Sequence, residues 1–268
     1  KPLRNVVGAL DYDKMNVEFP ERQPYLKCFC CPPNLVRTIA KSPGWAYSKS
    51  ENGIAVNLYG GNELNTTLLD GSAIKLNQKS NYPWDGAVQI TIEESKAEAF
   101  EMLLRIPAWA EGSTISVNGK AIDNVVAGSF AKINREWKAG DVISLNMPME
   151  VKFVEGHPRI EEVRNQVALK RGPVVYCVET ADLPENTSIF DVYVKGSNQF
   201  KPTYRPDYLG GMATLDGEVM IRKDKAMGMY QEVGVPKFDA YQTHLIPYYA
   251  WSNRGNGEMT VFMPMIWN

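Results

Sequence analysis

Short β-rich segments separated by glycine-containing turns constrain the fold of this chain more than any other feature. Asn52-Gly53, Asp70-Gly71 and Asn118-Gly119 each lie between two such segments. These dipeptides are strong signals of a tight β-hairpin because its central residues need a positive φ. Residues 87–92 alternate between apolar and polar side chains, which is typical of a strand with one buried face. Short strands at this spacing predict a β-sandwich.

The strand pattern falls into two blocks, and the 268-residue length has room for two medium-sized domains. We expect a first β-sandwich over residues 45–150 and a second over residues 151–268. In the second block, two apolar strands flank a Gly172-Pro173 turn, and residues 180–198 are polar and loop-like. The predicted fold is therefore mainly β, with two tandem β-sandwich domains.

Residues 1–44 differ from the rest of the chain. Residues 1–27 are interrupted by prolines and have no periodic pattern, as expected of a long loop that packs on another body. A short helix is predicted over residues 35–41, and Ser42-Pro43-Gly44 ends it. Pro32 and Pro33 suit the position just before this helix or its first turn, where a missing N–H is no loss.

Three of the four cysteines lie in the segment 28–34, Cys-Phe-Cys-Cys-Pro-Pro-Asn, directly before this helix. The partial positive charge of a helix N-terminus favours a thiolate, so a nucleophile or a metal site is one interpretation. A disulfide from Cys28 to Cys31 or Cys177 is another. The cysteines could also be small buried side chains, or a structural zinc site that takes further ligands from elsewhere.

Composition excludes some partners. With 29 basic and 31 acidic residues, the net charge of -2 gives no reason to expect nucleic acid or an anionic membrane surface as a partner. No apolar run approaches the length that spans a membrane. The chain begins without Met or a signal peptide, so we expect a processed or excised piece, and its location stays open.

The other residues that could carry chemistry are interpreted as structural. His157 lies beside a proline in a loop-like stretch, His244 falls in a strand pattern, and Cys177 is expected to be an inert core thiol. Four tryptophans could form a platform for a sugar ring, although packing within the β-domains is the favoured interpretation. They are Trp84, Trp109, Trp137 and Trp251.

Several motifs resemble the bacterial β-L-arabinofuranosidases of glycoside hydrolase family 127 and the related family 146. The most specific is Cys-Cys-Pro-Pro-Asn at residues 30–34, followed by Arg-Thr-Ile-Ala at 37–40 and Gly-Ile-Ala-Val-Asn-Leu-Tyr at 53–59. Weaker motifs extend the likeness along the chain, at residues 104–109, 116–119, 137–141, 168–173 and 246–251. Together they are similar to the C-terminal portion of that family.

The resemblance implies that residues 1–44 are the last part of an (α/α)6-barrel catalytic domain. It also implies a retaining mechanism in which Cys30 is both the nucleophile and a zinc ligand, and Cys31 is a second zinc ligand. Cys28 has no firm role in the family. The substrate would be an arabinose-containing oligo- or polysaccharide from plants, and the enzyme would be bacterial, periplasmic or cytoplasmic.

The family's acid/base glutamate and its remaining zinc ligands lie upstream of the cysteine motif, and no Glu-x-Cys pair occurs in this chain. We therefore expect the chain alone to be weakly active or inactive. One alternative is a non-catalytic β-sandwich module that braces a larger enzyme, forms a homodimer or binds glycan. A second alternative is a thiol-based zinc or redox protein.

Overall fold

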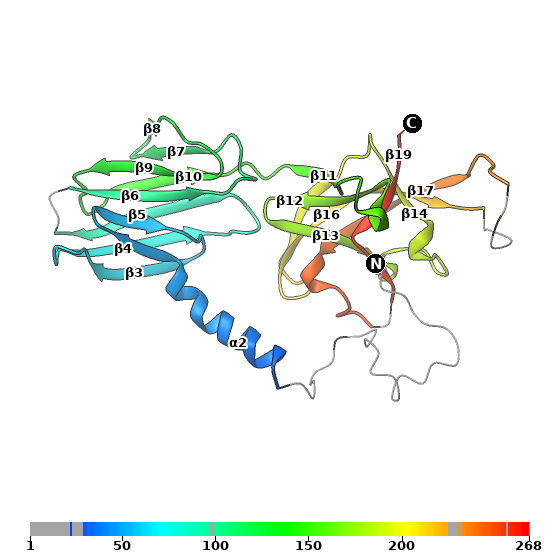
Figure 1. Ribbon diagram of the computed structural model, residues 1–268, viewed down its shortest axis with the longest axis horizontal. Coiled ribbons are helices and arrows are strands. Elements are labelled where there is room, and N and C mark those ends of the chain that lie inside the picture. Colours follow the sequence, from blue (N-terminus) through cyan, green and yellow to red (C-terminus); the bar gives the residue numbers. More distant parts are fainter. Residues whose placement is uncertain are drawn as a thin grey trace. The chain divides into compact units, whose positions relative to one another are not determined.

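The computed structural model describes Arg22 and residues 29–96, 99–224, 230, 232–255 and 257–267. The chain divides into two compact units (Figure 1): Leu26–Glu150 forms one, and Val151–Asn268 forms the other together with Lys1–Tyr25. Both units are built from β-sheets, which confirms the predicted mainly-β fold. Cys28 lies outside the described residues.

Helix α2, Cys31–Lys41, precedes the first strand and is followed by a short 3-10 helix, η1, Ser42–Trp45. The predicted helix over residues 35–41 is confirmed, but it begins earlier, at Cys31. Both prolines are accommodated in its first turn, where the N–H groups have no partner inside the helix. No residue of α2 is buried, and Leu35, Val36 and Ile39 are exposed.

The first unit consists of two sheets that enclose one apolar core. Fully buried Ile90, from the six-stranded sheet, and Leu104, from the four-stranded sheet, both belong to this core. The four-stranded sheet has the order β1 (Tyr47–Ser50), β2 (Gly53–Val56), β6 (Phe100–Ile106), β9 (Ser129–Arg135). The six-stranded sheet has the order β3 (Asn62–Thr67), β4 (Ala73–Ser80), β5 (Ala87–Ser95), β10 (Val142–Asn146), β7 (Thr114–Val117), β8 (Lys120–Ile122).

The hairpins predicted from turn dipeptides are confirmed in this unit. Strands β7 and β8 pair with Val117 opposite Lys120, which leaves Asn118 and Gly119 as a two-residue loop. Their φ angles of 50° and 79° are both positive, as this type of turn requires. The pairs β1–β2 and β3–β4 are also antiparallel, but their loops differ from the predicted dipeptides: Ser50 pairs with Gly53, so the first loop is residues 51–52, and Thr67 pairs with Ala73, so the second is residues 68–72.

The second unit contains a nine-stranded sheet whose pairings close into a circuit. Strand β12 pairs with both β13 and β19, and these two pairings close the ring. The strands are β11 (Val151–Glu155), β12 (Gln166–Arg171), β13 (Val174–Glu179), β14 (Val192–Lys195), β15 (Lys201–Arg205), β16 (Met212–Arg222), β17 (Phe238–Pro247), β18 (Met259–Thr260) and β19 (Phe262–Ile266). Four short 3-10 helices connect them: η2 (Glu161–Val163), η3 (Thr180–Asp182), η4 (Ile189–Asp191) and η5 (Tyr248–Ala250).

The expectation of a loop over residues 180–198 is wrong in part. This stretch contains β14, in which Val192 and Val194 are fully buried within the second core. The strand is short and is flanked by polar residues. Its two buried valines are too few to show the alternation of apolar and polar side chains that predicts a strand. It joins the sheet through a parallel pairing with β19, far away in the sequence.

Arg22 is the only residue among the first twenty-eight that the structure describes, and it packs on the second unit. Its guanidinium donates hydrogen bonds to the carbonyl oxygens of Tyr249 and Trp251, at 2.8 and 3.0 Å. The guanidinium carbon also lies 5.0 Å from the centre of the Trp251 ring. These contacts attach Arg22 to the backbone of η5 and of the residue that follows it.

None of the helices in the described part of the chain is long and apolar enough to cross a membrane.

Candidate functional site

Cys30 and Cys31 lie side by side at the N-terminus of helix α2. Cys30 is the N-cap residue and Cys31 is the first helical residue. Their Sγ atoms are 3.5 Å apart, and both residues are exposed. The predicted position of these thiols at the positive end of a helix dipole is confirmed.

The local sequence explains why the helix begins here. The N–H of Asn34 donates to the carbonyl oxygen of Cys30 at 3.1 Å and closes the first turn. The Asn34 side chain then accepts a hydrogen bond from Arg37 at 2.9 Å, and the Thr38 hydroxyl donates to the Asn34 carbonyl oxygen at 2.8 Å. These contacts hold the two thiols on an ordered turn.

The thiol pair fits half of a tetrahedral zinc site. Two thiolates on one zinc lie about 3.8 Å apart, because each Zn–S bond is about 2.3 Å long. The observed distance of 3.5 Å between the Cys30 and Cys31 sulfurs is close to that value. Among the described residues, no group of three or more metal-binding side chains occurs, so further ligands would have to come from elsewhere.

Cys177 has the opposite environment. It is completely buried in strand β13, and burial, followed by the charge of Glu179, raises the pKa of its thiol. The predicted core position of Cys177 is confirmed. A disulfide that involves Cys28 concerns a residue outside the described part of the chain.

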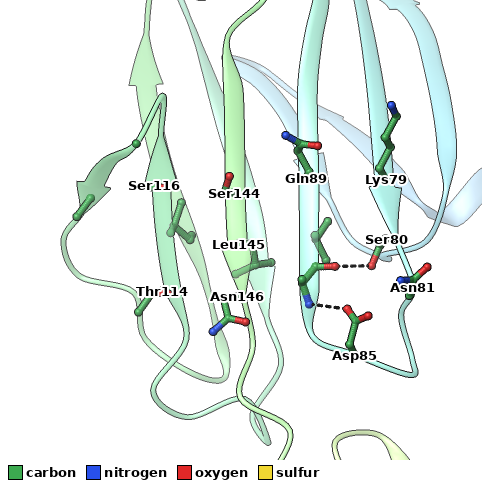
Figure 2. Close-up of a pocket in the computed structure, with 15 residues that line it drawn as sticks. Lys79, Ser80, Asn81, Asp85, Gln89, Thr114, Ser116, Ser144, Leu145 and Asn146 are labelled. Atoms are coloured by element: carbon green, nitrogen blue, oxygen red, sulfur yellow. Dashed lines mark hydrogen bonds between the residues drawn. The ribbon is translucent and has the colours of Figure 1, made fainter. Parts of the chain in front are cut away.

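A groove of about 670 Å³ lies on the six-stranded sheet of the first unit (Figure 2). It crosses strands β4, β5, β10, β7 and β8. Cross-strand pairing places Gln89 beside Ser144, and Ser144 beside Ser116. At one end, the Asp85 carboxylate accepts the N–H of Ala87 at 3.0 Å, which fixes the turn between β4 and β5. The groove is not evident from the sequence, because the alternation in residues 87–92 identifies the outward side chains of one strand but not the strands beside it.

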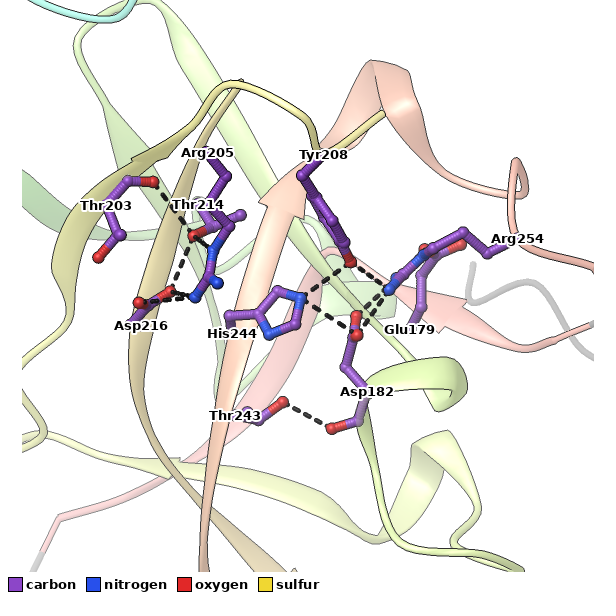
Figure 3. Close-up of polar contacts among 10 residues, drawn as sticks. All are labelled: Glu179, Asp182, Thr203, Arg205, Tyr208, Thr214, Asp216, Thr243, His244 and Arg254. Atoms are coloured by element: carbon purple, nitrogen blue, oxygen red, sulfur yellow. Dashed lines mark hydrogen bonds and ion pairs between the residues drawn. The ribbon is translucent and has the colours of Figure 1, made fainter. Parts of the chain in front are cut away.

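A second polar cluster lies in the second unit (Figure 3). The Arg254 guanidinium binds the carboxylates of Glu179 and Asp182, each at 2.5 Å, and also donates to the Tyr208 hydroxyl. His244 Nε2 lies 2.9 Å from that hydroxyl and 3.2 Å from Asp182 Oδ1. Of this cluster, only His244 was considered from the sequence, because the members come from four separate segments of the chain.

The contacts of this cluster indicate a structural role. The side chains of Glu179 and Asp182 are 8% and 5% exposed, and Arg254 pairs with both. Glu179 Oε1 also accepts the backbone N–H of Ser252 at 2.7 Å. Every named side chain therefore binds another part of the same domain, which agrees with the prediction for His244.

Two of the four tryptophans considered for a sugar platform, Trp109 and Trp137, pack within the first unit. Trp137 is 2% exposed, and its indole N–H donates to the Phe100 carbonyl oxygen at 3.0 Å, which confirms its predicted core position. Trp109 stacks on Tyr82 with ring centres 6.4 Å apart.

Comparison with known proteins places this fold in a family. The family model "Beta-L-arabinofuranosidase, GH127 middle domain" matches residues 53–149. A second model, "Glycoside hydrolase family 127 C-terminal domain", matches residues 151–264. The two models describe consecutive β-domains of one class of protein, the glycoside hydrolases. The chain belongs to glycoside hydrolase family 127.

Individual relatives agree with this assignment. A non-reducing end β-L-arabinofuranosidase from Bifidobacterium longum subsp. longum is 32% identical over 275 residues, which cover 96% of this chain and 41% of that protein. A solved structure described as a glycoside hydrolase is 37% identical with a TM-score of 0.88, covering 98% of this chain and 43% of that one. The structure of Ara127N-Se, a GH127 β-L-arabinofuranosidase from Geobacillus stearothermophilus T6, is 34% identical with a TM-score of 0.85 over 95% of this chain and 40% of that one. The chain thus spans less than half the length of these relatives.

Proposed function

We propose that this chain is the C-terminal portion of a retaining glycoside hydrolase that acts on β-L-arabinofuranosides in plant glycans. The family and the names of its relatives support the reaction class. The observation that carries the proposal for the site is the pair of sulfurs, 3.5 Å apart, at the N-terminus of α2. We propose that the segment up to residue 44 belongs to an (α/α)6-barrel catalytic domain.

Cys30 is the proposed nucleophile, and Cys30 and Cys31 are the residues that would hold zinc. Zinc, when bound, supplies a deprotonated thiol at neutral pH. The Cys30 sulfur attacks the anomeric carbon and forms a C–S bond while the bond to the leaving oxygen breaks, and a general acid protonates that oxygen. Water then attacks the same carbon, the C–S bond breaks, and the proton of the water passes to the same group acting as a base.

Within the described residues, the helix turn that carries the thiol pair supplies no general acid. The first turn of α2 contains no acidic residue. Loss of general acid–base catalysis costs about 10²–10⁴-fold in rate. The chain alone is therefore proposed to be weakly active or inactive, and homodimer formation through a β-sandwich stays a prediction.

Zinc content and thiol titration test the proposed site. We expect one zinc per chain in the longer protein that contains this chain, where the remaining ligands are present, and loss of that zinc in Cys30→Ser and in Cys31→Ser. Cys177→Ala is the matched control, since this thiol is buried in a strand of the other unit. Zinc that is retained in both Cys30→Ser and Cys31→Ser would exclude this pair as the metal site.

Hydrolysis of p-nitrophenyl β-L-arabinofuranoside tests the reaction. In the longer protein that contains this chain, Cys30→Ala should abolish hydrolysis, while Cys177→Ala should leave it nearly unchanged. The isolated chain should release little p-nitrophenol. Rapid release by the isolated chain that Cys30→Ala does not affect would contradict the proposed nucleophile.

A further inference from the structure

We propose that the groove on the six-stranded sheet of the first unit is a non-catalytic binding site for an uncharged oligosaccharide that contains arabinofuranose. The identity of this sugar rests on the proposed function. The preference for an uncharged, hydroxyl-rich ligand rests on the groove itself.

The groove presents hydrogen-bonding groups that the protein does not use. Gln89, Ser144 and Ser116 form one row across three strands, and Asn146 pairs with Thr114 in the row beside it. In the part of the chain that the structure describes, these five side chains make no hydrogen bond or ion pair with other residues. Amides and hydroxyls both donate and accept, which matches the hydroxyl groups of a sugar.

The groove carries fewer charged side chains than the part of the same sheet face near β3. Towards the β3 edge, Lys75 lies 2.7 Å from Glu93 and 4.0 Å from Glu63, so long paired side chains cover the sheet there. Among the described residues that line the groove, only Lys79 and Asp85 are charged, and their charges are opposite. A polyanion such as nucleic acid or an acidic glycan would need a cluster of cations instead.

The groove also lacks the anchors of a protein interface. Its larger apolar residues Val88, Ile115 and Leu145 are 3%, 2% and 2% exposed, so their side chains belong to the core beneath. Protein interfaces depend on buried aromatic or arginine anchors, and no such side chain lines this groove within the described residues. Hydrogen bonding to a glycan is the interaction that these residues favour.

The size of the groove suits several sugar units. Cross-strand neighbours continue from Lys79 through Gln89, Ser144 and Ser116 to Ala121. Five strands spaced about 4.8 Å apart span about 19 Å. With a volume of about 670 Å³, the groove has room for an oligosaccharide rather than a single ring.

Titration of the 268-residue chain with arabino-oligosaccharides, followed by NMR and calorimetry, tests the proposal. We expect chemical-shift changes at residues of β5, β7 and β10. The double variant Gln89→Ala, Asn146→Ala should lower the affinity at least about tenfold, the effect of about 1.4 kcal/mol. Ser144→Arg, which fills the centre of the groove, should abolish binding while the melting temperature stays unchanged.

Matched variants separate this site from the proposed catalytic one. Thr91→Ala lies in the same strand, two residues beyond Gln89, but outside the groove, so it should bind as the parent chain does. Cys30→Ser should also keep full binding. Absence of binding at millimolar sugar, binding that Ser144→Arg retains, or binding lost in Cys30→Ser would each overturn the proposal. A change of oligomeric state in Ser144→Arg without any sugar binding would overturn it in favour of a contact between protein copies.

Discussion

Two cysteines of this chain show how position decides the chemistry open to a thiol. Cys177 is buried in a strand, and this burial raises the pKa of its thiol. Cys30 is exposed at the positive end of a helix, with the sulfur of Cys31 3.5 Å away. Of these two residues, Cys30 is accessible to a substrate or a metal, which is why the proposed function rests on it.

At the same scale, His244 should make the stability of the second domain depend on pH. Burial lowers the pKa of His244, and this effect exceeds the opposite effect of the nearby Asp182 carboxylate. The positive charges of Arg205 and Arg254 lower this pKa further. The unfolded chain, with an ordinary histidine pKa near 6.5, therefore takes up a proton more readily than the folded one. The contribution of neutral His244 to the free energy of unfolding is therefore complete above about pH 6.5. It falls as the pH drops from there towards the lowered pKa of the folded state.

Melting temperatures between pH 7.5 and 5 measure this effect. His244→Gln should flatten the pH dependence, although it should also lower the melting temperature by disturbing the contact with Tyr208. His157 is the other histidine of the chain and is exposed, so His157→Gln is the matched control and should keep the full dependence. If the melting temperature of His244→Gln depends on pH as strongly as that of the parent chain, other groups cause the dependence.

At the scale of elements, close approach of two backbones makes one glycine essential to the first domain. Strand β2 pairs in parallel with β6, and a Cβ atom on Gly53 would lie 1.9 Å from the Glu101 carbonyl oxygen. Gly53→Ala should therefore force the strands apart and lower the free energy of unfolding by about 1–3 kcal/mol.

Denaturant unfolding checks this prediction against a second glycine. Gly60 has no atom within 4 Å of the position that a Cβ would take, so Gly60→Ala should change the free energy of unfolding by less than about 0.5 kcal/mol. Equal effects of the two substitutions would show that backbone entropy, rather than the contact with Glu101, is responsible.

The sequence predicted these elements well where the signal is local. Hairpins such as β7–β8 were predicted because Asn118 and Gly119 lie next to each other in the chain. The parallel pairs β2–β6 and β14–β19 were not, because each joins strands far apart in the sequence. The position of the thiol pair was predicted because Cys30 and Cys31 are also neighbours in the chain, directly before the helix. The groove was missed because it depends on the register of five strands.

At the scale of the whole molecule, the described residues form two apolar cores, each within one unit. Leu104 is completely buried in the first core, and Leu245 in the second. This separation corresponds to the two family matches, which meet near residue 150. Each domain thus has the buried surface on which its own stability depends.

The two cores predict that the domains lose stability separately. Leu104→Ala and Leu245→Ala should each cost about 2–5 kcal/mol, because each leaves a cavity in a packed interior. Hydrogen exchange followed by mass spectrometry should show faster exchange in residues 47–146 for Leu104→Ala and in residues 151–266 for Leu245→Ala. If either substitution accelerates exchange equally in both ranges, the chain unfolds as one cooperative body. In that case, a defect in the second domain would also disturb the thiol pair and the groove of the first.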